Sequence, residues 1–164
     1  MRYDDPSTAL YQTTIISKSL VEDSQYSAHQ DGTFIGPNGN VLAYWIPLTP
    51  AKRENGCLWG IPGSHSLPIK WWYRKENRHS YKCRFNGEHP DWDLTTKVYL
   101  EVNPGDLLIF PGSFIHGSDA ATQEPKGIAD LRVALTYHLG PVEHWDELTW
   151  LKLSPHNTIS LFKD

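Results

Sequence analysis

Three side chains in this sequence have the chemistry of a metal site. His29-Gln30-Asp31 has the form His-x-Asp, and residues two apart in an extended segment project from the same face. His116, in the segment FIHG after a Pro-Gly turn, is the best placed third ligand. Two neutral imidazoles and one carboxylate form the facial triad that suits iron(II) and leaves coordination positions open. The alternative is that this common tripeptide is a surface or structural feature.

Arg132 is the second candidate site residue, and its neighbours indicate where it points. Segment 131–139 alternates, so in a strand Arg132, Ala134, Thr136 and His138 share one face and larger apolar residues share the other. A guanidinium can hold a carboxylate through two parallel hydrogen bonds, and Ala134 leaves volume for a ligand beside it. The alternative is an edge-strand arginine in a surface ion pair.

Short strands joined by turns must position these residues. Apolar and β-branched runs between Gly and Pro signals predict strands over 10–18, 41–48, 57–61, 98–102, 106–110, 113–117 and 131–139. Asn55-Gly56 and the segment 103–106 (NPGD) predict hairpin-like turns. About seven strands come near the eight of a double-sheet jelly roll, so the predicted class is all-β. Helix is expected only in part of 142–151.

Composition bounds the remaining possibilities. A chain of 164 residues with 39% hydrophobic residues predicts one globular domain, residues 1–164. The net charge of −4 argues against a nucleic-acid coat or a membrane-surface protein, and no segment is apolar enough to span a bilayer. Cys57 and Cys83 are predicted to be free thiols in an intracellular, cytoplasmic protein. The commonest hydrolase and nucleotide-binding motifs are absent from the sequence.

Four segments carry a family resemblance. They are HQDGTF, YWIPLTPAKRENGCLWGIPGSH, NPGDLLIFPGSFIHGS and LRVALTYHL, and together they resemble the phytanoyl-CoA dioxygenase family over about residues 10–140. The resemblance implies a double-stranded β-helix, a barrel of the jelly-roll and cupin type, with iron(II) as the metal. It also implies that 2-oxoglutarate is oxidatively decarboxylated to succinate with O2 while an organic substrate is hydroxylated, with ascorbate as a supporting reductant.

The resemblance assigns roles position by position. His29, Asp31 and His116 match the iron ligands, and Arg132 matches the residue that binds the distal carboxylate of 2-oxoglutarate. Further co-substrate contacts match Trp45 and Ser118, and a weaker one matches Thr14. Trp45 is equally well explained as a core aromatic residue, and Ser118 as a turn hydroxyl. For His65 and His138, a structural role is favoured over support of the metal ligands.

The sequence departs from the family pattern in two places. Family members carry a helical region before the first barrel strand, and this chain begins almost at that strand. Because segment 41–48 is apolar on both faces, an uncovered patch is predicted, and the chain is expected to be truncated or to form a homo-oligomer through this face. The insertion 70–93 mixes basic and aromatic residues, which would suit a lid or a solvated loop with buried aromatics.

Three functions remain open at this stage. The first is an active dioxygenase that hydroxylates a small organic molecule. The second is a truncated, non-catalytic metal-binding member that acts as a binding module. The third is a metal-dependent cupin of another class, such as an isomerase, which would not need Arg132. Substrate identity is not encoded in the motifs, because selectivity in this fold lies in the loops.

Overall fold

The described part of the chain is built from β-strands. The computed structural model describes residues 7–18, 25–33, 35, 40–70 and 91–142. Its strands are β1 (Thr8–Lys18), β2 (Tyr26–His29), β3 (Leu42–Pro47), β4 (Leu58–Gly60), β5 (Val98–Leu100), β6 (Leu108–Pro111), β7 (His116–Ser118) and β8 (Arg132–Pro141). Among the described residues between these strands, the helical elements are short 3-10 turns such as η2 (Asp31–Thr33), in line with the all-β prediction.

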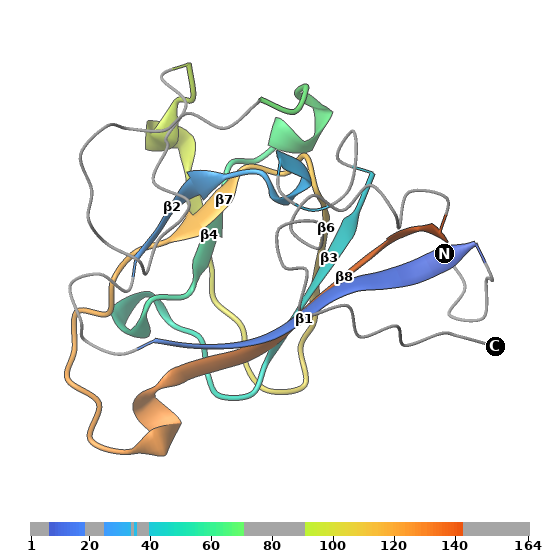
Figure 1. Ribbon diagram of the computed structural model, residues 1–164. Helices are drawn as coiled ribbons and strands as arrows, with labels where there is room; N and C mark the ends of the chain where they lie inside the picture. Colours follow the sequence, from blue (N-terminus) through green and yellow to red (C-terminus); the bar gives the residue numbers. More distant parts are fainter. Residues whose placement is uncertain (1–6, 19–24, 34, 36–39, 71–90, 143–164) are drawn as a thin grey trace, which may run out of the picture.

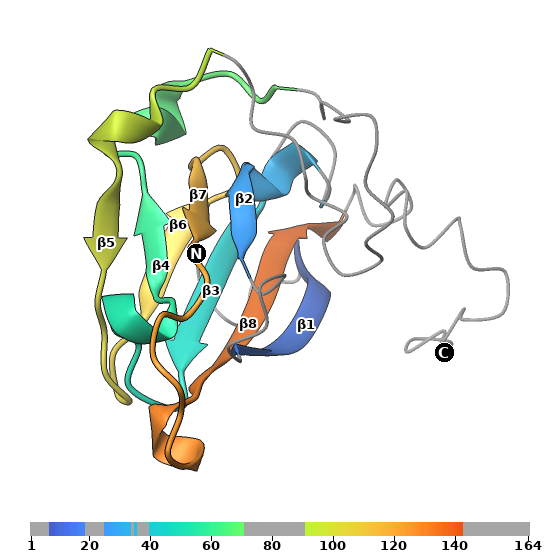
Figure 2. The same ribbon diagram turned by 90° about the vertical axis from the view of Figure 1, so that its left-hand side faces the viewer.

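The strands form two four-stranded antiparallel sheets. The order is β1-β8-β3-β6 in one sheet and β2-β7-β4-β5 in the other. Figures 1 and 2 show the two sheets as separate layers. Strands far apart in sequence, such as β1 and β8, are neighbours, which is the jelly-roll arrangement of a double-stranded β-helix. The predicted fold is therefore confirmed.

Both predicted turns are present, but the hairpins expected around them are wrong. Asn55 ends a 3-10 turn whose next residue, Gly56, is left-handed with φ 81°. The other turn closes with a 3.0 Å bond from the Asp106 amide to the Asn103 carbonyl. The strands on either side, β3 and β4, or β5 and β6, lie in different sheets. Turn residues predict only that the chain changes direction. Which sheet each flanking strand joins depends on which of its faces must be buried.

Two further expectations differ from the structure or fall outside its described part. The predicted strand 113–117 is shorter and later, because the amide of Phe114 closes a turn on Pro111 and pairing begins at His116. The expected helix in 142–151 falls almost wholly outside the described residues, as do Cys83 and residues 71–90 of the insertion. In the described part of the chain, no helix has the length and apolarity that crossing a bilayer requires.

Alternation along β8 and β3 decides which side chains face the barrel interior. Arg132, Ala134, Thr136 and His138 are all buried, which confirms the predicted face of segment 131–139. On β3 the buried positions include Ala43 and Trp45, and these belong to a core cluster with Ala51, Cys57, Leu58, Phe110 and Ala134. The interior face of the first sheet is therefore part apolar core and part buried polar surface.

The opposite face of the β1-β8-β3-β6 sheet is apolar and partly exposed. Ile15 is 68% exposed and Ile109 53% exposed on this face, while Tyr44 and Tyr137 stack with ring centroids 4.8 Å apart. These residues match the uncovered patch that the two-sided pattern predicted. Whether a second copy of the chain covers it stays a prediction, which size-exclusion chromatography with light scattering can test.

Gly117, the residue after His116, is closely packed, and this packing gives a prediction about the stability of the fold. A Cβ at Gly117 would lie 2.7 Å from the Tyr26 carbonyl oxygen and would also clash with the buried Trp59 ring. Gly117→Ala is expected to destabilise the fold by about 2 kcal/mol and to lower Tm by roughly 4–8 °C, measured by thermal unfolding followed by circular dichroism. Gly127→Ala is the control, since nothing lies within 4 Å of its Cβ position. Equal Tm values for the two variants would contradict this packing.

Candidate metal centre

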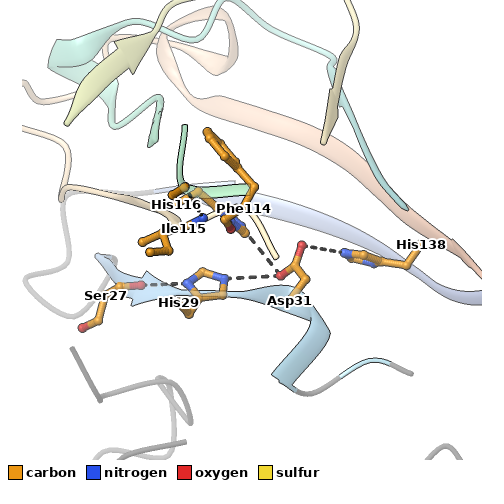
Figure 3. A network of polar contacts seen from close by, with 8 residues as sticks. Ser27, His29, Asp31, Phe114, Ile115, His116 and His138 are labelled. Atoms are coloured by element: carbon orange, nitrogen blue, oxygen red, sulfur yellow. Dashed lines mark hydrogen bonds and ion pairs between the residues drawn. The ribbon is translucent and has the colours of Figure 1, made fainter. Parts of the chain in front are cut away.

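The structure brings the three predicted metal-site residues together. His29 ends β2 and His116 begins β7, and the two residues are direct partners in the antiparallel register. Asp31 opens the 3-10 turn η2, which follows β2. The candidate ligand atoms of the three residues lie within 4.8 Å of one another, and Figure 3 shows the side chains converging. The pairing of β2 with β7 thus brings His116 beside His29, and the His-x-Asp spacing brings Asp31 close to both.

Both imidazoles are held with the same nitrogen turned inward. His29 Nδ1 lies 2.7 Å from the Ser27 carbonyl oxygen, and His116 Nδ1 lies 3.0 Å from the Phe114 carbonyl oxygen. A carbonyl oxygen only accepts, so in the neutral ring each Nδ1 carries the proton and each Nε2 carries the lone pair. This orientation by a backbone carbonyl is the usual support of a metal-ligating histidine.

The Nε2 atoms face one oxygen of the carboxylate. Asp31 Oδ1 lies 3.5 Å from His29 Nε2 and 3.7 Å from His116 Nε2. Donors that each lie about 2.1 Å from one first-row metal ion can be up to about 4.2 Å apart. Both separations fall inside that limit, so one ion can bridge Oδ1 and either imidazole.

Burial and the neighbouring charges set the protonation states that a metal needs. Burial raises the pKa of Asp31, but the nearby His116, the hydrogen bond from His138 and the contact with His29 outweigh burial and hold that pKa well below its usual range. Burial lowers the pKa of His116 to about 4, against the opposing effect of Asp31. A carboxylate and a neutral imidazole are therefore the forms present at neutral pH, and these are the ligand forms of a facial triad.

Gln30, between the first two candidate ligands, fixes the segment that carries them. Its side chain is fully buried and donates to the Ser113 carbonyl over 2.7 Å, while its Oε1 accepts from the Lys70 amide over 2.9 Å. Thr33 Oγ1 then donates to the Lys70 carbonyl over 3.1 Å. Lys70 Nζ also lies 3.7 Å from Asp91, so the two described ends of the insertion meet beside the site. This role of Gln30 was not predicted from the sequence, although alternation predicts that Gln30 points opposite to its neighbours.

Arg132 is a buried cation, and the surface alternative for it is therefore wrong. It is 1% exposed, its Nε donates to the Gly56 carbonyl over 3.1 Å, and its guanidinium lies 5.5 Å from the centroid of the Trp45 ring. Burial lowers the pKa of Arg132 to about 10, so the group stays charged at neutral pH. Among the described residues, its Nη1 has no hydrogen-bond partner. A buried charge with an unused donor is the signature of a site for an anion.

Lys18, which was not predicted from the sequence as a site residue, adds a second buried cation at the same end of the barrel. It pairs with Arg132 in the β1-β8 register and is 2% exposed. Its Nζ donates to the Asp119 carbonyl and lies 5.8 Å from the centroid of the Tyr26 ring. Two buried positive charges on adjacent strands strengthen the local field that an anion would meet.

Several buried side-chain atoms on β3, β7 and β8 lack a hydrogen-bond partner among the described residues. In the described part of the chain, the buried atoms without a hydrogen-bond partner are Trp45 Nε1, Ser118 Oγ, Arg132 Nη1 and His138 Nδ1. Ser118 ends strand β7 and is 1% exposed, so it is not a turn hydroxyl. Trp45 does belong to the apolar core, yet its indole N–H is unused. Buried polar groups are normally satisfied, so these four atoms indicate a polar ligand.

Thr14 lies in the same interior row but is engaged locally. It pairs with Thr136 in the β1-β8 register, and Thr136 pairs with Trp45 on β3. Its Oγ1 accepts from Gln12 Nε2 over 3.1 Å, and its carbonyl accepts from Thr136 Oγ1 over 3.4 Å. The structure therefore places Thr14 near the other expected co-substrate residues. Its co-substrate contact stays a prediction.

Comparison with known proteins identifies the family. A family model described as Phytanoyl-CoA dioxygenase (PhyH) matches residues 2–127. Phytanoyl-CoA dioxygenase 1 of Oryza sativa subsp. japonica is 33% identical over 155 residues, covering 93% of this chain and 52% of that protein. Phytanoyl-CoA dioxygenase domain-containing protein 1 of Rattus norvegicus is 34% identical over 148 residues, covering 86% of this chain and 48% of that protein. The chain thus spans about half the length of these curated relatives.

Solved structures share the fold at lower sequence identity. EvdO2 from Micromonospora carbonacea var. aurantiaca, complexed with 2-oxoglutarate, matches with a TM-score of 0.65 and 21% identity over 83% of this chain and 53% of that one. The epimerase SnoN, in complex with Fe3+, alpha ketoglutarate and nogalamycin RO, matches with a TM-score of 0.63 and 16% identity over 96% and 60%. The family match takes in His29, Asp31 and His116 and ends just before Arg132. The chain therefore belongs to the phytanoyl-CoA dioxygenase family of iron(II)- and 2-oxoglutarate-dependent oxygenases.

Proposed function

We propose that the chain is a dioxygenase that hydroxylates a small organic molecule and converts 2-oxoglutarate to succinate. In this proposal His29, Asp31 and His116 bind one iron(II) ion, and Arg132 binds the distal carboxylate of 2-oxoglutarate. The observation that carries it is the buried guanidinium of Arg132, whose Nη1 has no hydrogen-bond partner among the described residues, in a barrel that also brings the three ligand residues together. A metal site alone would not require that cation.

The energetics favour an anionic ligand at Arg132. A buried ion costs several kcal/mol in lost hydration unless an opposite charge and good hydrogen bonds offset it. The polar contact found for Arg132 among the described residues is to a backbone carbonyl, and the nearest ring is Trp45. The carboxylate of a ligand would supply the missing negative charge and would satisfy Nη1. The structure thus supports an anionic ligand more than a neutral one.

The layout of β8 supports a ligand with two different ends. Arg132 begins the strand and His138, six residues on, contacts Asp31, so the cation and the metal-site residues lie at the two ends of one interior face. Thr136 and the small Ala134 lie between them, and Trp45 and Ser118 contribute unused polar atoms nearby. A dicarboxylate with a keto acid at one end matches this arrangement, because one end suits a metal and the other suits a guanidinium.

The protein's own part in the reaction is positioning. Bound iron(II) with 2-oxoglutarate would supply the oxidising chemistry with O2. Arg132 would fix the orientation of the co-substrate, and the triad residues would occupy one side of the metal and leave the other side open. Phe110 lies 4.6 Å from the His116 ring, and this apolar wall restricts water near the ligands.

A direct assay tests the proposal. Purified chain with iron(II), ascorbate, O2 and 2-oxoglutarate should form succinate slowly even without substrate, as measured by mass spectrometry. His116→Ala should remove this activity, because it deletes one of the three metal ligands. His65→Ala is the matched control, since His65 is exposed and outside the site. No succinate from folded, iron-loaded wild type would contradict the proposal and favour the non-catalytic binding module.

Several sequence-based expectations remain predictions that accompany this proposal. They are a single domain over residues 1–164, a reducing intracellular compartment, homo-oligomerisation through the exposed sheet face, and a substrate role for the segment 70–93. Cys57 is a buried free thiol, and burial raises its pKa to about 11, so it is a poor nucleophile. The substrate is proposed only as a small organic molecule.

A further inference from the structure

His138 lies on the far side of Asp31 from the two candidate ligand histidines. Its Nε2 is 3.0 Å from Asp31 Oδ2, while the other oxygen, Oδ1, faces the Nε2 atoms of His29 and His116. Figure 3 shows the carboxylate between these two sides. The two carboxylate oxygens can therefore have different roles: Oδ1 can bind a metal, and Oδ2 accepts a hydrogen bond from the protein.

The protonation pattern separates His138 from the ligands. An ionised carboxylate only accepts, so His138 donates from Nε2, and in the described part of the chain its Nδ1 has no partner. His29 and His116 have the reverse pattern, with Nδ1 on a backbone carbonyl and Nε2 facing Asp31 Oδ1. His138 is 7% exposed, so its ring is held by its surroundings. The geometry gives it the role of a donor to the carboxylate.

The bond also joins the two sheets of the barrel. The three candidate ligands belong to β2, β7 and the turn after β2, all in or beside one sheet. His138 and Arg132 both lie on β8 in the other sheet. A hydrogen bond from His138 to Asp31 therefore couples the metal-bearing segment to the strand that carries the proposed co-substrate cation.

We propose that His138 is a positioning residue that holds Asp31 so that only Oδ1 is offered to the metal. The inference rests on the proposed function, because it concerns the same metal site. With Oδ2 engaged by His138, the carboxylate cannot turn to present both oxygens. The coordination position that Oδ2 would otherwise occupy stays open for the co-substrate.

Anaerobic titration with Co(II), followed by its visible absorption, tests this role without turnover. His138→Leu should weaken Co(II) binding by about 10- to 100-fold and change the spectrum, because Oδ2 is free to join the coordination sphere. His138→Gln keeps an N–H donor near the same place and should restore most of the affinity and the wild-type spectrum. His138→Asn, whose shorter amide does not reach Oδ2, replaces the Leu variant if circular dichroism shows that His138→Leu is unfolded.

The outcomes separate this inference from the proposed function. Wild type that binds no Co(II) would overturn both. Normal wild-type binding, with an unchanged affinity and spectrum in folded His138→Leu or His138→Asn, would overturn the positioning role alone. A Gln variant as weak as the Leu variant would also overturn it, since the donated hydrogen bond would then not matter. His65→Leu, at an exposed histidine, controls for the loss of an imidazole elsewhere.

Discussion

Arg132→Met is expected to remove 2-oxoglutarate binding while the unliganded chain stays about as stable as the wild type. The loss of two charge-assisted hydrogen bonds should cost about 3 kcal/mol or more, which is at least about 100-fold in Kd. The free energy of unfolding should hardly change, because two effects of the variant oppose each other. It leaves the Gly56 carbonyl without its hydrogen-bond donor, but it also removes a buried cation whose Nη1 has no partner among the described residues. Isothermal titration with metal-loaded protein gives Kd, and thermal unfolding gives stability.

Two further variants sharpen this prediction. Arg132→Lys should recover little affinity, because an ammonium on a shorter side chain cannot form two parallel bonds to a carboxylate. Arg53→Met is the matched control, because Arg53 is exposed and packs over Tyr99 outside the site. Full 2-oxoglutarate affinity in Arg132→Met would refute the co-substrate role and favour a cupin of another class. A large loss of stability in that variant would show that the guanidinium has an internal partner of structural weight.

Asp31→Asn should have the largest effect on the metal itself. It removes the one negative ligand from a buried site, at a cost of roughly 3–5 kcal/mol, or about 10²- to 4 × 10³-fold in metal affinity. The amide is almost isosteric, so the fold should persist. Co(II) or iron(II) titration under anaerobic conditions measures the loss, with Asp106→Asn on an exposed turn as the control. Wild-type affinity in Asp31→Asn would exclude this carboxylate as a ligand.

Acid unfolding of the metal-free proteins provides a second measure of the same carboxylate. Because the pKa of Asp31 is held below its ordinary value of 3.8, the unfolded chain binds more protons there, and stability is lost as pH falls through and below that value. Asp31→Asn should lack this part of the acid loss. His116, with a pKa lowered to about 4 from 6.5, adds a separate loss of stability between those two pH values. Superimposable acid profiles of the two proteins would contradict the shifted pKa of Asp31.

The sequence was sufficient to predict the placement of those site residues whose side-chain direction depends on local geometry. Arg132 lies on a strand whose alternation fixes its inward direction. The two-residue spacing of His29 and Asp31 also predicted that their side chains would meet, although Asp31 lies in the 3-10 turn that follows β2. His116 was found because it follows a turn and matches a family motif. In each case a short stretch of sequence carries the information.

What the sequence could not supply depends on contacts between distant segments. The turns at Gly56 and Gly105 were recognisable, but the sheet that each next strand joins depends on how distant strands pair. Strand β2 spans only Tyr26–His29 and has no clear pattern of its own. The partner of His138 is 107 residues away in sequence, so a structural role was the reasonable interpretation even though its inward direction was predictable.

The anchoring of Lys70 bears on two properties that a protein engineer would wish to vary independently, metal loading and the range of molecules accepted. Gln30 and Thr33 hold its amide and carbonyl beside Asp31, and its side chain forms an ion pair with Asp91. A segment exchanged after Lys70 therefore starts from a backbone position that is fixed relative to the ligands. A cassette library over residues 71–90 should leave metal loading constant from clone to clone, and a change in the molecules accepted would support the substrate role proposed for this segment.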